Sequence, residues 1–389
     1  MIMKKIKIGL IGYGTIGANH AKYLSAGEVQ NAELTAICDP NPAQIERSKK
    51  DLAGKISPQY FNDVQELIKS GCVDGILICV PHYEHPDLIV AGLENNLHVL
   101  CEKPVGVYTK NIRTVNAVAA KSKKVFGIMF NQRTNPIHKK LREMIETNEL
   151  GEIKRTNWII TTWYRSQSYY DAGGWRASWA GEGGGVLLNQ CPHQLDLWQW
   201  ICGMPKRVLA FCGFGKYHNI EVEDDVTAYV EYENGATGVF ITTTGETPGS
   251  NRFEIAGDMG KITMENGKLV FCKTAVSERQ FNREFKGGFG SPANEAIEIN
   301  IEGENPEHKG ITQNWVDSIL TGSPLLAPGV EGINSLELSN AMLLSSWTDD
   351  WVDLPIDDDL FYEKLQKKIK TSKFKKETNN LNMNAKGTF

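Results

Sequence analysis

"GLIGYGTIGANH", residues 9–20, sets three glycines in a turn that directly follows the apolar run 6–11. Their spacing is G-x-G-x-x-G, and a helical pattern continues from the last glycine. In a strand–turn–helix unit the first glycine permits the tight turn, the second lets a pyrophosphate approach the backbone, and the third lets helix and strand pack closely. The stretch therefore predicts the first βα unit of a dinucleotide-binding domain. The cofactor-binding positions in this turn are Gly12, Gly14, Thr15, Ile16 and Gly17.

The second apolar run, 33–39, ends in an aspartate, Asp39, which stands 22 residues after Gly17. An acidic side chain at this place accepts hydrogen bonds from the ribose hydroxyls of the adenosine half of the cofactor. No arginine directly follows Asp39, and Arg47 is eight residues further on, so no guanidinium is adjacent for a 2′-phosphate. The sequence therefore favours NAD, and NADP is the less favoured alternative.

Apolar runs of strand length alternate with helical stretches up to about residue 130, as in a doubly wound parallel sheet. These runs are 6–11, 33–39, 74–80, 97–102 and 125–130. Later segments instead alternate apolar and polar residues, and Asn234-Gly235 between two of them is a strong hairpin signal. An antiparallel sheet should therefore follow the parallel one, with helical insertions near 186–203 and 330–348.

This change of pattern divides the chain into three segments. We expect an α/β dinucleotide-binding domain over 1–130 and an α+β domain for substrate and oligomer contacts over 131–365. The remaining residues, 366–389, are polar and lysine-rich, so we expect them to form a disordered tail.

Composition excludes several classes of partner. The chain has 42 basic and 47 acidic residues, which gives no electrostatic footprint for nucleic acid or an anionic membrane. No apolar run is long enough to span a bilayer, and charges interrupt the first seven residues, so a cytoplasmic location is expected. The eight cysteines lack C-x-x-C spacing and should be reduced. His82-x-x-His85 has no further ligand at a known spacing, so no metal is expected.

Three stretches together resemble the Gfo/Idh/MocA oxidoreductases, which include glucose–fructose oxidoreductase and inositol dehydrogenase. They are "GLIGYGTIGANH", "HVLCEKP" and "GEGGGVLLNQCPHQLDLWQW", and the resemblance runs from about residue 4 to about residue 360. It implies an N-terminal Rossmann domain and a C-terminal domain with an open, mostly antiparallel sheet. It also implies a homodimer or homotetramer formed through that sheet.

The resemblance also assigns residues around the nicotinamide. It implies that Lys103 of the E-K-P motif is catalytic, with Glu102 beside it in the cofactor site. It matches Pro81 and His85 to a loop that borders the nicotinamide, so this loop is interpreted as a cofactor wall.

A glycine loop at 183–185 leads into a helix on which Asn189, His193 and Asp196 share one face. The resemblance places the catalytic histidine at His193 and the family's frequent aspartate at position 189, which here is asparagine. Asn189 can position a sugar hydroxyl or the imidazole but carries no charge. Asp196 is the nearer carboxylate, and it could support His193, bond a backbone group or bond Lys103.

Oxidation of a secondary alcohol needs a base for the hydroxyl proton and a group that holds the reacting oxygen. The ordinary pKa of histidine suits His193 as the base, and Lys103 would hydrogen-bond the same oxygen. If these two side chains pack together, each should lower the pKa of the other.

Six of the nine tryptophans lie between residues 158 and 200, among tyrosines and arginines. Aromatic faces pack on the C–H face of a sugar ring, and Arg and Tyr bond its hydroxyls, so this segment is interpreted as a sugar or cyclitol site. Alternatively these residues fill a domain or subunit interface, and Arg165 or Arg176 could bind a phosphate or carboxylate. The predicted substrate-binding residues are Lys103, Trp163, Arg165, Tyr169, Tyr170, Trp175, Arg176, Asn189 and His193.

Three functions remain open. The leading hypothesis is an NAD-dependent enzyme that oxidises or reduces a secondary hydroxyl of a sugar, glycoside or cyclitol. The second is a redox-neutral glycosidase with tightly held NAD, in which transient oxidation at C3 permits elimination and Tyr169 or Tyr170 is the C2 base. The third is a non-catalytic sugar or nucleotide sensor, which the presence of both Lys103 and His193 argues against.

Overall fold

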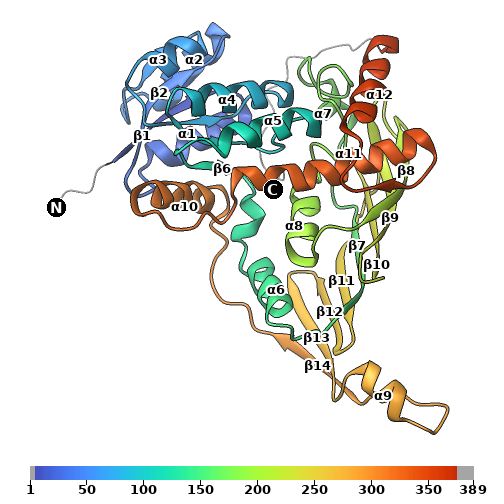
Figure 1. Ribbon diagram of the computed structural model, residues 1–389. Coiled ribbons are helices and arrows are strands. Elements are labelled where there is room, and N and C mark those ends of the chain that lie inside the picture. The colour runs from blue at the N-terminus through green and yellow to red at the C-terminus, as the bar shows by residue number, and fades with distance from the viewer. Residues whose placement is uncertain (1–4, 375–389) are drawn as a thin grey trace.

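The computed structural model describes residues 5–374, and its N-terminal part is a six-stranded parallel sheet in the order β3-β2-β1-β4-β5-β6 (Figure 1). The strands are β1 Ile6–Ile11, β2 Ala32–Cys38, β3 Gln59–Phe61, β4 Gly75–Ile78, β5 His98–Cys101 and β6 Phe126–Ile128. All five apolar runs form strands, as predicted. The sequence did not reveal β3, because it pairs only three residues with β2 and contains no apolar run.

Helices connect these strands in the manner of a doubly wound fold. They are α1 Thr15–Ser25, α2 Pro42–Leu52, α3 Val64–Lys69, α4 His85–Glu94 and α5 Thr109–Ala119. The chain turns to the opposite side of the sheet between β1 and β4, which are hydrogen-bonded neighbours. A crevice is therefore expected at the carboxyl ends of these two strands, where such folds bind their ligands.

The second part of the chain forms a nine-stranded sheet in the order β14-β13-β12-β11-β7-β10-β9-β8-β15. Its strands are β7 Ile153–Ile160, β8 Arg207–Phe214, β9 Glu223–Glu231, β10 Thr237–Thr243, β11 Asn251–Gly257, β12 Gly260–Glu265, β13 Lys268–Thr274, β14 Asn294–Ile299 and β15 Val352–Asp353. Among the described strands of this second sheet only β7 and β10 pair in parallel, so the expected mostly antiparallel sheet is confirmed. The predicted hairpin joins β9 to β10, with Gly235 at a φ of +82° in its turn.

Helices cover one face of this sheet and connect it to the first domain (Figure 1). The helices of this part of the chain are α6 Pro136–Glu146, α7 Gln167–Asp171, α8 Pro192–Cys202, α9 Glu278–Glu284, α10 Glu307–Thr321, α11 Gly332–Thr348 and α12 Asp358–Thr371. Of these, α9 lies beyond the end of the sheet next to β14, and α10 lies beside the first domain. The core beneath α8 is aromatic, because Trp198 stacks on Phe240 at 5.4 Å between ring centroids. Trp158 stacks on Phe253 at 4.3 Å in the same layer. Both predicted helical insertions are therefore present, as α8 and α11.

One segment of the expected second domain packs against the first domain in space. Helix α10 comes late in the sequence, yet Figure 1 shows it beside the parallel sheet of the first domain. Its Trp315 is fully buried, and a Cβ at Gly75 or Gly127 would lie 2.8 Å or 3.3 Å from that indole. The segment 307–321 therefore completes the core of the N-terminal domain, which chain order alone could not indicate.

The disordered tail expected over 366–389 is wrong in its first part, because α12 continues to residue 371. Phe361 and Leu365 on this helix are buried one turn apart, so a short apolar stripe anchors an otherwise lysine-rich segment. Residues 375–389 of the expected tail lie outside the described residues. Within the described chain, none of the helices has the length and apolar character needed to cross a membrane.

Candidate active site

The glycine turn follows β1 and leads into α1, and its three glycines meet different steric demands. Gly12 has a φ of +91°, and a Cβ there would lie 2.3 Å from the carbonyl oxygen of Cys79. A Cβ at Gly17 would lie 2.0 Å from the Gly12 carbonyl oxygen, so only glycine allows this approach of helix and strand. Gly14 is exposed, with no atom within 4 Å of a Cβ position, so the N-terminal N–H groups of α1 are open to a pyrophosphate.

Asp39 follows β2 and is held at the edge of the crevice by the backbone. Its two carboxylate oxygens accept hydrogen bonds from the N–H groups of Tyr13 at 2.8 Å and Asn41 at 2.9 Å. Arg47 lies over the Tyr13 ring, and its Nε is 3.6 Å from Oδ2 of Asp51. This guanidinium already has an acidic neighbour, which agrees with the preference for NAD over NADP.

Other residues predicted at the cofactor lie around the same crevice. Thr15 and Ile16 form the first turn of α1 and are half-buried. Pro81 is half-buried in the loop after β4, where it directly precedes the short 3₁₀ helix η1, His82–Glu84. The turn, the β2 edge and this loop therefore surround one space, and the chain's own residues fit a dinucleotide there.

The loop after β5 carries Lys103, and the Lys103–Pro104 peptide is cis. Lys103 Nζ donates a hydrogen bond of 2.7 Å to the carbonyl oxygen of Asn189, which comes from the second domain. His85 is buried, and its two ring nitrogens lie 2.6 Å and 2.8 Å from the carbonyl oxygens of Pro104 and Val80. His85 therefore joins the two loops that surround the crevice through their backbones.

Glu102 lies in a buried polar network beneath Lys103. Its Oε1 is 2.7 Å from His20 Nε2 and 4.0 Å from His308 Nε2, and its Oε2 accepts a 3.2 Å hydrogen bond from the Lys103 N–H. Burial opposes ionisation of Glu102, but His20, His308 and Lys103 outweigh it and lower its pKa to about 2. Sequence reasoning missed His20, although it is the last residue of the opening stretch.

The glycine loop before α8 is fixed by a buried carboxylate from β9. Glu223 Oε1 accepts hydrogen bonds from the N–H groups of Gly185 at 2.8 Å and Leu187 at 3.0 Å. A Cβ at Gly185 would lie 1.9 Å from the carbonyl oxygen of Glu223, so the loop and the strand can approach this closely only with glycine. Burial raises the pKa of Glu223 to about 7, although the loop N–H groups favour its charged form.

His193 lies in the first turn of α8, and only 6% of it is exposed. The helix begins at Pro192, so Asn189 lies before it, and the expectation that Asn189 shares a helical face with His193 and Asp196 is wrong. Its Nδ1 is buried without a hydrogen-bond partner in the described chain, and its ring meets Phe130 edge-on. Burial and then the charge of Lys103 hold the pKa of His193 well below its usual value. Lys103 has a pKa lowered to about 8 by burial, with Arg176 and Arg165 adding to the effect. One half of the expected mutual effect, that of Lys103 on His193, is therefore confirmed.

Asn189 does not stand alone in place of the family's aspartate. Its side-chain Nδ2 donates to Oε1 of Glu182, a carboxylate that is only 1% exposed. The other oxygen of Glu182 accepts a 2.7 Å hydrogen bond from the Ala177 N–H, and its backbone carbonyl lies 3.2 Å from His82 Nδ1. A carboxyl group is thus present beside Asn189, but it belongs to a residue seven positions earlier in the chain than the family's aspartate. Glu182 was within the quoted glycine stretch, but nothing in its spacing indicated this contact.

Asp196 is bound to an arginine and not to Lys103. Its two oxygens accept hydrogen bonds of 2.8 Å and 2.7 Å from Nε and Nη2 of Arg133, and both side chains are buried. Arg133 belongs to the 3₁₀ helix η2, Asn131–Thr134, and also donates to Oε2 of Glu331 at 2.6 Å. The expected alternative of a bond to Lys103 is therefore wrong, and this ion pair ties α8 to the segment between the domains.

Tyr169 is the centre of the aromatic segment at the site. Its hydroxyl accepts hydrogen bonds from Arg176 Nη1 at 2.7 Å and Gln190 Nε2 at 3.0 Å. The guanidinium carbons of Arg165 and Arg176 lie 5.2 Å and 4.6 Å from the Tyr169 ring centroid. Arg165 also lies over Trp163. The structure therefore brings most of the expected substrate-binding side chains into one half-buried group.

Some aromatic residues of the same segment fill the core instead. Tyr170 is 1% exposed, and its hydroxyl is 2.7 Å from Oγ1 of Thr244. Trp158 and Trp198 belong to the stacked layer under the sheet, as described above. Trp175 meets His82 edge-on at 5.1 Å, which places it at the loop after β4. The alternative interpretation, that aromatic residues of this segment fill the core, thus holds for Tyr170, Trp158 and Trp198.

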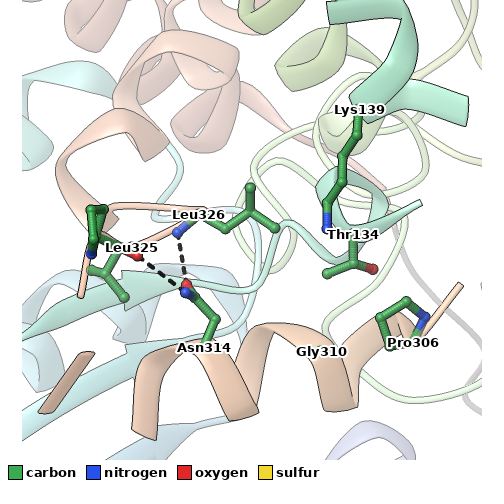
Figure 2. Close-up of a pocket in the computed structure, with 8 residues that line it drawn as sticks. Thr134, Lys139, Pro306, Gly310, Asn314, Leu325 and Leu326 are labelled. Atoms are coloured by element: carbon green, nitrogen blue, oxygen red, sulfur yellow. Dashed lines mark hydrogen bonds between the residues drawn. The ribbon is translucent and has the colours of Figure 1, made fainter. Parts of the chain in front are cut away.

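The described residues contain no group of three or more His, Cys, Asp or Glu that could hold a metal ion. A separate open pocket of about 380 Å³ lies between α10 and the η2–α6 segment. Figure 2 shows its lining, in which Asn314 is hydrogen-bonded to the loop at Leu326 while Lys139 reaches toward Thr134. None of the residues that line it belongs to the site described above.

Comparison with known proteins gives two family matches. A family model described as an oxidoreductase family, NAD-binding Rossmann fold, matches residues 6–130. A model of the GFO/IDH/MocA C-terminal domain matches residues 138–263. Together the two models cover more than half of the chain, in the order that the structure shows.

Individual relatives are distant in sequence. The rhizopine catabolism protein MocA of Rhizobium meliloti is 30% identical over 52% of this chain and 58% of its own length. The inositol 2-dehydrogenase of Rhizobium meliloti strain 1021 is 23% identical over 87% of this chain and 96% of its own length. The WlbA dehydrogenase of Chromobacterium violaceum, crystallised with NADH and UDP-GlcNAcA, is 26% identical, with a TM-score of 0.78 over 92% of this chain and 98% of its own.

Proposed function

The chain belongs to the GFO/IDH/MocA family of NAD-binding oxidoreductases, and we propose that it oxidises or reduces a secondary hydroxyl of a sugar or cyclitol. In this proposal His193 is the general base and Lys103 holds the reacting oxygen. The observation that carries it is the Lys103 ammonium, which donates across the domains to the carbonyl oxygen of Asn189. Four residues later, at the start of α8, stands the buried His193, whose Nδ1 has no hydrogen-bond partner among the described residues. Relatives named as inositol dehydrogenases support the substrate class.

His193 is suited to accept a proton because its lowered pKa keeps the ring neutral at pH 7. A neutral imidazole has one nitrogen free to accept, and no described side chain competes for it by hydrogen bonding. When the substrate hydroxyl loses its proton, His193 takes that proton and becomes charged. The nearby Lys103 makes this charged form costly, so His193 should release the proton readily after the reaction.

Lys103 is suited to hold the oxygen because a pKa of about 8 leaves most of it protonated at pH 7. One of its three N–H donors is used by the Asn189 carbonyl, and two remain for the substrate. An ammonium in this desolvated place stabilises negative charge that develops on the reacting oxygen. Glu102, with a pKa of about 2, stays charged beneath it and offsets part of the cost of burying the ammonium.

NAD supplies the redox chemistry when bound, and the protein supplies position. The open N-terminus of α1 at Gly14 would bind the pyrophosphate, and Asp39 would bind the adenosine ribose. The loops joined by His85 would then fix the nicotinamide end beside Lys103.

A redox-neutral glycosidase is the second candidate, and one observation bears on it. This chemistry needs a base for the C2 proton, and Tyr170 is unsuited because it is buried and bonded to Thr244. The Tyr169 hydroxyl instead lies at the site, held by Arg176 and Gln190. Tyr169 is therefore the residue to test for that role.

The test is to incubate the purified protein, checked for copurified NAD, with inositols, free sugars and aryl glycosides. NADH absorbance and aglycone release are followed together. NADH formed in proportion to one class of alcohol supports the proposed function. Aglycone release without net NADH contradicts it in favour of the glycosidase, and binding of a sugar with no turnover contradicts it in favour of a sensor.

A further inference from the structure

Arg165 occupies a fixed position at the site. Its backbone N–H donates to the carbonyl oxygen of Thr244 at 2.9 Å, and its own carbonyl oxygen lies 2.8 Å from His218 Nε2. The side chain then lies over the rings of Trp163 and Tyr169, with its guanidinium carbon 5.6 Å and 5.2 Å from their centroids. Such an arginine loses little conformational freedom when it binds a ligand.

The guanidinium of Arg165 is poorly satisfied by the protein. Its one side-chain hydrogen bond is donated from Nη1 to the carbonyl oxygen of the preceding Tyr164, at 2.9 Å. Its Nε is buried and has no hydrogen-bond partner within residues 5–374. A buried donor of a charged group is costly to leave unpaired, so this arrangement favours an anionic ligand.

Neighbouring polar atoms are unsatisfied in the same way. Trp163 Nε1 is buried without a partner, and it belongs to a ring on which Arg165 lies. Gln190 Oε1 is also buried without a partner, while its Nε2 donates to the Tyr169 hydroxyl. The Arg165 guanidinium thus offers an unpaired Nε–H donor, and the adjacent Trp163 offers a second one at Nε1. Gln190 Oε1 is an unpaired acceptor that a hydroxyl of the same ligand could use.

This group is continuous with the reacting centre. Gln190 directly follows Asn189, whose carbonyl oxygen binds Lys103 Nζ. Arg176 shares the Tyr169 ring with Arg165, and the charges of both arginines lower the pKa of Lys103. The site also holds the carboxyl group of Glu182, which accepts a hydrogen bond from the Asn189 amide. Two guanidinium groups and one ammonium group therefore act on a site with one such acidic side chain.

We propose that the substrate is a sugar or cyclitol that carries an oxyanion, a carboxylate or a phosphoryl group, and that Arg165 binds this group. The inference rests on the proposed function for the reaction itself, but anion binding can be measured without turnover. In the uncharged alternative a sugar hydroxyl would accept from the Arg165 Nε, which pairs the donor but leaves the positive charge without a counter-charge.

The experiment compares matched ligands. Glucuronate represents the carboxylate, glucose 6-phosphate the phosphoryl group, and glucose and myo-inositol the neutral case. Binding to the NADH-loaded protein is followed by calorimetry. Oxidation of each ligand is followed separately, with NAD⁺ in place of NADH, as NADH absorbance. Both measurements are repeated at several salt concentrations. Arg165→Met is the test variant and Arg165→Lys keeps the charge. Arg142→Met is the control, because Arg142 also lies over a tryptophan, Trp200, outside the site.

We expect one anion to bind at least tenfold more tightly than its neutral counterpart, and salt should weaken its binding. Arg165→Met should weaken binding of that anion by about 10- to 100-fold and should affect kcat less. Arg165→Lys should recover part of the lost affinity. Arg142→Met should leave both the affinity and kcat unchanged. Equal binding of neutral and anionic ligands, or equal effects of Arg165→Met on both, would overturn the inference. Anion binding without turnover of any ligand would instead support it and contradict the proposed function.

Discussion

The two halves of the site are built on different principles. The cofactor half is made by a turn whose Gly12, Gly14 and Gly17 lie within six residues, and it acts mainly through backbone N–H groups. The substrate half gathers side chains from the loop after β7 and from α8, with Lys103 arriving from the other domain. Local sequence therefore specifies the first half, whereas the second exists only once the two domains pack.

The largest effect should come from the residue that joins the halves. Lys103→Met should lower kcat by at least about 10³-fold, because it removes the charged donor at the reacting oxygen. NAD affinity should stay within severalfold, since the glycine turn and Asp39 are untouched. Steady-state kinetics measure kcat, and fluorescence titration with NADH measures the cofactor affinity. A variant that keeps most of its rate would remove Lys103 from the mechanism.

The Asn189–Glu182 pair offers a test within the substrate half alone. Asn189→Asp should lower kcat by about 10- to 100-fold, because two buried carboxylates would then meet where an amide now donates. Glu182→Gln should also lower the rate, since Asn189 loses its charged acceptor. The double variant restores a carboxylate–amide contact with the roles exchanged and should recover activity relative to either single change.

A double-variant cycle on kcat/KM checks this coupling, with circular dichroism to confirm folding. Additive losses would mean that the two side chains act independently. Recovery would show that the family's aspartate and this chain's asparagine solve the same problem with the charge placed on different residues.

A smaller effect is expected at the edge of the cofactor half. Asp39→Ala should weaken NAD binding by about tenfold, because hydrogen bonds to the ribose hydroxyls are lost. It should also reduce the ratio of the affinity for NAD to the affinity for NADP. Asp39→Asn is the matched control, since its amide oxygen can still accept one of the N–H groups of Tyr13 and Asn41. Titrations with both dinucleotides give the ratio, and unchanged selectivity in Asp39→Ala would refute the ribose assignment.

The same contrast explains what could be predicted from sequence. The parallel strands, the glycine turn and the Asn234-Gly235 hairpin were predictable, because each is specified by residues close together in the chain. The partners of Asn189 and Asp196 were not, because Glu182 and Arg133 reach them only through the tertiary fold. A helical face limits which side chains can meet, but it does not say which neighbour will be opposite.

Errors of segment assignment have a similar origin. Trp315 in α10 is apolar enough to be recognised as core, yet its sequence does not say which of the two cores it joins. The lysines of α12 indicated a solvated tail, although Phe361 and Leu365 bury one side of the helix. Composition averages over both sides of a helix, whereas packing depends on one.

The smallest expected effect concerns how the substrate half is held in place as pH changes. Glu223 is fully buried against the glycine loop, and burial raises its pKa to about 7 from an ordinary 4.5. The folded protein therefore binds this proton more tightly than the unfolded chain does. Stability contributed by the neutral form should be fully present below about pH 4.5 and should fall as pH rises through about 7.

Glu223→Gln mimics the neutral acid and keeps an oxygen that can accept from Gly185 and Leu187. We expect the free energy of unfolding of the wild type, measured by calorimetry, to fall relative to that of this variant between pH 5 and pH 8, by an amount on the order of 1–3 kcal/mol at pH 8. A difference that stays constant with pH would mean that Glu223 does not titrate in this range. The loop before α8 would then be held by a carboxyl group whose protonation does not change over this range, and any pH dependence of the substrate half would come from other groups such as Lys103.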